Sequence, residues 1–155
     1  MEKIPITQEG LQKLREELTR LETVERPMNI KAIAEARSHG DLSENAEYHA
    51  AKERQSFLEG KINELKDVLG RADVISTDDG PTDRVVFGRR VVLFDIQTEE
   101  EVTYQLVGPY ESAPEAGRIS IESPLGRGLI GRCVGDEVKI RVPRGIQEYE
   151  ILEIR

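Results

Sequence analysis

The first half of the chain carries the hydrophobic spacing of a long, paired helix. Apolar side chains recur at steps of three and four residues, which is the seam spacing of a coiled coil. They are Leu11, Leu14, Leu18 and Leu21, and Met28 and Ala32 extend the same stripe. Thr7 is the predicted N-cap of this helix. Pro27 either kinks the helix or opens a second helical segment at its first position.

A second helix is predicted to start near Ser43. Its stripe consists of Leu58, Ile62, Leu65 and Leu69, and the small residues Ala46, Ala50 and Ala51 precede it. The short polar segment 39–42 between the two helices favours an antiparallel hairpin. Arms of about 27–30 residues, at about 1.5 Å per residue, make a rod of roughly 40–45 Å with the connecting loop at its far tip.

The second half of the chain changes to the period of β-strands. Ser76–Asp83 is a linker by composition, and Arg127–Ile130 is compatible with one short helical turn. The runs that predict strands are Arg84–Gly88, Arg90–Ile96, Val102–Val107, Arg118–Ile121, Glu137–Val142 and Tyr149–Ile154. We therefore expect a helical hairpin over residues 1–75, a linker over 76–83, and an α+β domain with a mostly antiparallel sheet over 84–155.

Charge and composition narrow the classes of function. The net charge is −8, so the overall field does not attract nucleic acid. Any RNA contact must come from a local basic patch or from a partner that already holds the RNA. The lone Cys133 cannot form an internal disulfide. Neither a signal peptide nor an apolar run of about 20 residues is visible, so we expect a soluble cytoplasmic protein.

Two carboxylates stand at the predicted tip of the hairpin. Asp41 and Glu44 lie three residues apart at a helix start, and this spacing can place both on one side. Such a pair can contribute to a Mg²⁺ site, and a second metal ion can activate water for phosphodiester hydrolysis. The alternative is a capping box in which Asp41 is the N-cap, and from spacing alone this is the commoner case. Two carboxylates are too few for a tight site, so the remaining ligands must come from elsewhere.

The tip run His39–Tyr48, HGDLSENAEY, resembles the tip signature of the Gre family of bacterial transcript cleavage factors. The likeness covers the whole chain. Further matching blocks are Ile4–Thr7, Lys13–Leu18, Ile33–Arg37, Val86–Gly88, Tyr104–Gly108, Ile119–Ser120, Ser123–Leu125, Leu129–Gly131, Val134–Asp136 and Tyr149–Leu152. In Ala51–Gln55 the acidic Glu53 stands between the basic Lys52 and Arg54. This mixed charge favours the A type of the family over its B type, whose helix is more basic here.

The resemblance implies a specific mechanism. The C-terminal domain would be similar to FK506-binding proteins and dock at the rim of the RNA polymerase secondary channel. The coiled coil would enter the channel, where Asp41 and Glu44 help hold the second Mg²⁺ and a water. The polymerase's own aspartates hold the first ion, and backtracked RNA is then cut. The chain would be an accessory factor and no enzyme, and by itself it would bind no Mg²⁺ tightly.

The resemblance also implies roles for other residues. Arg37 and Lys52 would form a basic patch that contacts the extruded RNA, although by sequence alone they are ordinary helix-surface charges. Ser43, Asn45 and Tyr48 would support the tip, or they only pack it. The residues that would grip the polymerase are Ser123, Pro124, Leu125, Arg127, Leu129 and Ile130; alternatively they form a strand-to-helix connection. We expect Ala more often where Gly126 or Gly128 stands, so extra glycine would loosen this segment.

Three other functions compete with transcript cleavage. The first is a relative that blocks the polymerase channel without cleavage, although such relatives carry a more densely acidic tip. The second is a prolyl isomerase, against which stand few, scattered aromatic residues and no Trp. The third is a self-sufficient nuclease, which two tip carboxylates do not support. We expect a monomer whose partners are bacterial RNA polymerase and, through it, the RNA 3′ end, with no membrane contact.

Overall fold

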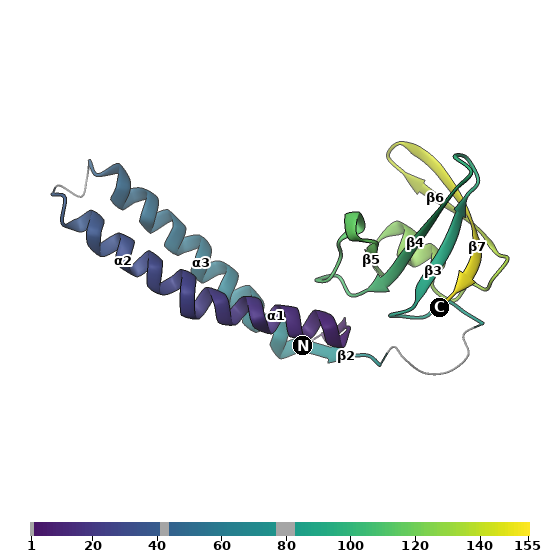
Figure 1. Cartoon of the computed structure of the whole chain (residues 1–155), viewed down its shortest axis with the longest axis horizontal. Coiled ribbons are helices and arrows are strands. Elements are labelled where there is room, and N and C mark those ends of the chain that lie inside the picture. The colour runs from purple at the N-terminus through teal and green to yellow at the C-terminus, as the bar shows by residue number, and fades with distance from the viewer. Residues whose placement is uncertain (1, 41–43, 77–82) are drawn as a thin grey trace. The chain divides into compact units, whose positions relative to one another are not determined.

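The computed structural model describes residues 2–40, 44–76 and 83–155 (Figure 1). The chain divides into two compact units, one formed by Leu11–Arg71 and the other by Met1–Gly10 together with Ala72–Arg155. The predicted boundaries at 1–75, 76–83 and 84–155 stay a prediction. Within the described ranges, no helix is long and apolar enough to cross a membrane.

The first unit is the predicted antiparallel helical hairpin. One arm consists of α1 (Gln8–Arg20), the π-helical turn η1 (Leu21–Glu25) and α2 (Arg26–Arg37). The other arm is α3 (Ala46–Arg71), which runs back along α2 (Figure 1). Thr7 is confirmed as a cap, because its Oγ1 accepts a hydrogen bond from the Gly10 N–H at 3.0 Å.

The apolar seam agrees with the prediction only in part. In α3, Ile62 and Leu65 are buried as expected, Leu58 and Leu69 are half-buried, and Val68, outside the predicted stripe, is buried. The expectation for Met28 was wrong, because its side chain is 63% exposed while its neighbour Asn29 is buried. The cause is η1, which adds a wide turn to the helix and shifts the buried face by one position. Pro27 is the second residue of α2 and does not open a separate helix at its first position, because the backbone stays helical on both sides of η1.

A short parallel pair escaped the sequence analysis. Strands β1 (Ile4–Ile6) and β2 (Ala72–Val74) pair from Ile4 opposite Ala72 to Ile6 opposite Val74. Three residues are too few to establish a two-residue period, and the partners lie far apart in sequence. No local pattern could therefore have joined them.

The second unit is an α+β domain built on a mixed, mostly antiparallel sheet. The strands are β3 (Arg90–Asp95), β4 (Glu100–Val107), β5 (Arg118–Ser120), β6 (Glu137–Val142) and β7 (Gly145–Ile154), in the order β5-β4-β3-β7-β6. The pair β4–β5 is parallel, and the other pairs are antiparallel. Two short helices complete the unit, η2 (Pro114–Ala116) and α4 (Pro124–Leu129). The predicted fold class is confirmed, while its likeness to FK506-binding proteins stays a prediction.

The predicted strand Arg84–Gly88 was wrong. Only Arg84 forms a bridge, to Cys133, and the chain then turns, with the Arg89 N–H bonded to the Val86 carbonyl at 3.3 Å. Gly88 has a φ of 85°, which glycine adopts without strain. Val85 is nevertheless fully buried in the domain core, so the apolar character of the run marks a packed loop.

Candidate functional site

The hairpin tip is organised by one side chain, that of Asn45. Its Oδ1 accepts the backbone N–H of Tyr48 at 3.1 Å, and its Nδ2 donates to the Ala36 carbonyl at 2.6 Å. The first bond is an N-cap of α3, and the second satisfies a carbonyl at the end of α2. Asn45 therefore closes both helix ends at once and ties the two arms together beside the loop.

This cap changes the interpretation of the tip carboxylates. A capping box over Asp41 and Glu44 requires Glu44 to stand inside the first turn of the helix. The structure begins α3 at Ala46, with Asn45 as its cap, so Glu44 precedes the helix and is exposed. The capping alternative was wrong for Glu44. Asp41 and Ser43, the other tip residues singled out by the sequence, lie outside the described residues.

Glu44 borders a shallow open depression of about 540 Å³. The lining residues are His39, Glu44, Asn45, Ala46 and Glu47. His39 Nε2 lies 3.8 Å from a carboxylate oxygen of Glu47. Neither residue is among the predicted site residues, since no spacing rule connects them across the loop. The depression presents two exposed carboxylates.

The described tip residues offer ligands of the right kind for a hard cation but too few to hold one. An exposed carboxylate such as that of Glu44 is the kind of oxygen ligand that Mg²⁺ takes. Among residues 2–40, 44–76 and 83–155, no group of three or more His, Cys, Asp or Glu side chains is placed to hold a metal ion. The arrangement can add ligands to a metal site that another molecule holds.

The predicted basic patch is spread over both arms. The Arg37 guanidinium carbon lies 5.9 Å from the centroid of the Tyr48 ring, a cation–π contact. Tyr48 also meets His49 edge-on, with 5.8 Å between ring centroids. Lys52 is exposed on α3 and donates to Gln55 Oε1 at 3.0 Å. Tyr48 thus has a defined packing role, whereas Arg37 and Lys52 remain accessible cations near the tip.

The predicted docking segment consists of α4 and its two flanking residues, Ser123 and Ile130. The Ser123 hydroxyl accepts the Gly126 N–H at 3.1 Å as the N-cap and donates to the Ser120 carbonyl at 2.6 Å. Pro124 is exposed in the first turn and Leu125 is half-buried. Leu129 is fully buried in the domain core. Leu129 is therefore corrected from a contact residue to a residue that supports the surface from beneath.

An apolar groove of about 560 Å³ opens beside α4. The lining residues are Arg84, Val85, Val86, Phe87, Ile121, Arg127, Ile130 and Gly131. Val86 and Ile130 are 45% and 41% exposed. Two predicted docking residues, Arg127 and Ile130, thus share a groove with residues 84–87. These belong to the wrongly predicted strand Arg84–Gly88, of which only Val86–Gly88 was a resembling block.

The glycines of α4 do not loosen the segment. Gly126 is buried, and a Cβ at this position would collide with the Ser120 carbonyl. Gly128 packs against Val138, which a Cβ would approach to 3.1 Å. Glycine here permits close packing of α4 on β5 and β6, and an alanine at 126 requires α4 and Ser120 to move apart.

Two family models together match most of the chain. The family model "Transcription elongation factor, N-terminal" matches residues 4–74, and "Transcription elongation factor, GreA/GreB, C-term" matches residues 80–155. Transcription elongation factor GreA of Rhodospirillum rubrum is 54% identical over 155 residues, covering 100% of this chain and 99% of the relative. GreA of Caulobacter vibrioides is 55% identical over 154 residues, covering 99% and 98%. The crystal structure of GreA factor homolog 1 (Gfh1) protein of Thermus thermophilus is 28% identical, covers 99% of each chain and has a TM-score of 0.45.

Proposed function

Because the chain belongs to the GreA/GreB family of transcription elongation factors, we propose that it stimulates RNA polymerase to cleave the 3′ end of backtracked RNA. The chain binds the polymerase and inserts its hairpin tip into the secondary channel. It supplies tip carboxylates, and the polymerase supplies the rest of the active site. In this role the chain is an accessory factor that acts wherever the polymerase does, in the cytoplasm.

The single observation that carries this proposal is that the Glu44 side chain is exposed at the tip and does not cap α3. Its carboxylate is exposed, directly before α3, and Asn45 performs the capping that would otherwise occupy it. A charged group left exposed beside a rigid cap is available to a ligand outside the chain. Asn45 also fixes the backbone next to Glu44 through its bond to the Ala36 carbonyl, which favours binding of a ligand in one geometry.

The proposed division of labour follows from the shortage of ligands on the chain. Glu44 and Asp41 contribute oxygen ligands, and polymerase groups complete the site. The shared Mg²⁺, when bound, polarises phosphoryl oxygens and lowers the pKa of a bound water. Arg37 and Lys52 pair with phosphates of the extruded RNA. The tip residues Ser43, Asn45 and Tyr48 hold this arrangement in place.

Docking is assigned to the groove beside α4. Its apolar floor and exposed Ile130 favour burial of an apolar partner surface, and Arg84 and Arg127 on its lining can pair with acidic groups of that partner. Ser123, Pro124 and Leu125 present the adjacent turn, with Leu129 beneath it. A partner that grips this surface is the polymerase at the rim of its channel.

Cleavage of labelled RNA in a stalled, backtracked polymerase complex tests the proposal. The native chain is compared with Asp41→Ala plus Glu44→Ala at matched occupancy of the polymerase. The proposal predicts faster cleavage with the native chain and binding without stimulation by the double variant. Equal stimulation by both would refute the carboxylate role. A native chain that binds but slows both cleavage and synthesis would instead identify a channel inhibitor.

A further inference from the structure

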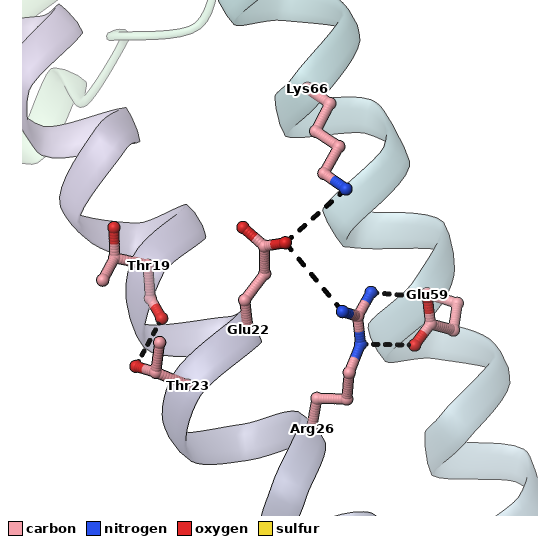
Figure 2. A network of polar contacts seen from close by, with 6 residues as sticks. All are labelled: Thr19, Glu22, Thr23, Arg26, Glu59 and Lys66. Atoms are coloured by element: carbon pink, nitrogen blue, oxygen red, sulfur yellow. Dashed lines mark hydrogen bonds and ion pairs between the residues drawn. The ribbon is translucent and has the colours of Figure 1, made fainter.

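A wide turn interrupts the first arm of the hairpin at η1. Its defining bond joins the Arg26 N–H to the Leu21 carbonyl, five residues back, where a regular α-helix uses four. The next residue, Pro27, has no N–H, and in a regular helix its ring would crowd the Thr23 carbonyl. The Thr23 hydroxyl donates to the Thr19 carbonyl at 2.7 Å (Figure 2). The sequence thus places the wide turn where proline disfavours the regular one.

The wide turn changes which side of α2 faces α3. Continued at three- and four-residue steps, the stripe that ends at Leu21 would reach Met28 and then Glu35. The buried residues are instead Asn29 and Ala36, at 6% and 2% exposure. Each stands one position later, which is the displacement that one extra residue in a turn produces. Since one residue corresponds to about 100° of rotation, η1 decides the rotational phase of α2.

An ion-pair network secures the arms directly after this turn. Arg26 Nε and one terminal nitrogen donate to the two Glu59 oxygens at 2.8 and 2.9 Å across the hairpin. Glu22 lies 3.9 Å from Arg26 and 3.5 Å from Lys66 (Figure 2). Exposed ion pairs usually contribute little, but bidentate, networked pairs are the exception. The bond to Arg26 also holds the pKa of Glu59 below its usual range, so the pair is charged at neutral pH.

The shifted face makes the contacts that lead to the tip. Asn29 Nδ2 donates to the Ala51 carbonyl at 3.1 Å, and Asn45 donates to the Ala36 carbonyl at 2.6 Å. Both Asn29 and Ala36 occupy the buried positions that η1 creates. A different phase would turn the Ala36 carbonyl away from Asn45, the residue that fixes the backbone beside Glu44.

We propose that η1 and the Arg26–Glu59 bridge set the rotational phase of the tip half of the hairpin, so that Arg26 and Glu59 are positioning residues for the Glu44 carboxylate. The catalytic part of this inference rests on the proposed function. The phase itself is a property of the hairpin and can be measured without polymerase.

The distance between the arms tests the phase. Spin labels at Glu35→Cys and Ala50→Cys, both exposed positions, are placed in the full chain carrying Cys133→Ser. Deletion of Val24 removes one residue from η1, and we expect the distance peak to move by several Å, because a rotation of about 100° carries the label around a helix roughly 10 Å wide. An unmoved peak in the deletion would overturn the role of η1.

Arg26→Gln tests the bridge in the same labelled chain. We expect a broadened distance distribution, and the charge swap Arg26→Glu plus Glu59→Arg should narrow it again. Asp67→Asn is the matched control, because it removes an ion pair of 2.8 Å to Arg71 that lies within one helix. A native distribution in Arg26→Gln, or equal broadening in Asp67→Asn, would overturn the positioning role.

Transcript cleavage supplies the second readout. Arg26→Gln should lower the maximal cleavage rate at least about threefold, since displacement of reacting groups by about 1 Å costs up to about 100-fold. The chain concentration that half-saturates the polymerase should stay unchanged. Native cleavage despite a broadened distance would refute the link to the tip. If the native chain itself fails to stimulate cleavage, the proposed function fails, while the label distances still decide the phase.

Discussion

At the scale of single residues, Asn45 explains why the capping prediction failed. Asp and Asn are about equally good N-caps, and Asp41 had Glu44 in the matching position for a capping box. Asn45 caps α3 through the Tyr48 N–H and also donates to the Ala36 carbonyl, a contact over nine residues that no local pattern reveals. The sequence could name the tip carboxylates but not which residue would cap the helix.

Replacing Asn45 tests its double role. Asn45→Ala loses the N-cap, which costs about 1 kcal/mol, and also leaves the Ala36 carbonyl without its side-chain donor. Asn45→Ser keeps a capping oxygen and is too short to reach Ala36, so we expect an intermediate loss. Urea unfolding of the full chain followed by helical circular dichroism measures both, and equal stability of Asn45→Ala and the native chain would contradict the assignment.

At the scale of elements, the hairpin was predictable and its phase was not. The leucine stripe and the polar connection gave two antiparallel arms, and Pro27 marked the place of the irregularity. Pro27 did not reveal that the turn would be π-helical and that Asn29 would be buried in place of Met28, so Met28 was wrongly placed in the seam. The three-residue strands β1 and β2 were missed for a related reason, because their pairing is long-range.

The Arg26–Glu59 bridge predicts a dependence of stability on pH. The hydrogen bond to Arg26 lowers the pKa of Glu59 from its ordinary 4.5, so folding favours the charged carboxylate. This contribution is present above the unfolded pKa and is lost as pH falls through the lower folded pKa. The melting-temperature difference between the native chain and Glu59→Gln should therefore be present at neutral pH and shrink as the pH falls below the ordinary pKa of 4.5. A difference that grows on acidification would contradict this sign.

At the scale of the whole molecule, two compact units carry separate cores. Ile62 is fully buried in the hairpin, and Leu93 is fully buried in the sheet domain. Each change to Ala should cost about 2–5 kcal/mol. We expect Ile62→Ala to speed amide hydrogen exchange in α3 but not in β3, and Leu93→Ala to do the reverse. Exchange that rises in both units with either variant would show that they unfold as one.

The groove beside α4 predicts a selective loss of polymerase binding. Ile130→Ser removes an exposed apolar side chain from the groove lining, and its burial in a complex would contribute enough for a loss of about tenfold in affinity. Val134→Ser is the matched control, because Val134 is 52% exposed and is not among the lining residues. Titration of labelled polymerase measures both, and equal losses would remove the groove from the interface.

The most direct test of the account is the Mg²⁺ dependence of transcript cleavage in a backtracked complex with Glu44→Gln. Exchange of the charged carboxylate oxygen for a neutral amide oxygen weakens the bond to Mg²⁺ and should raise the half-saturating Mg²⁺ concentration at least about tenfold, while binding of the chain to polymerase stays native. Glu53→Gln, which changes an exposed carboxylate on α3, should leave the Mg²⁺ curve unchanged. A native Mg²⁺ curve for Glu44→Gln would contradict the claim that the tip donates a metal ligand.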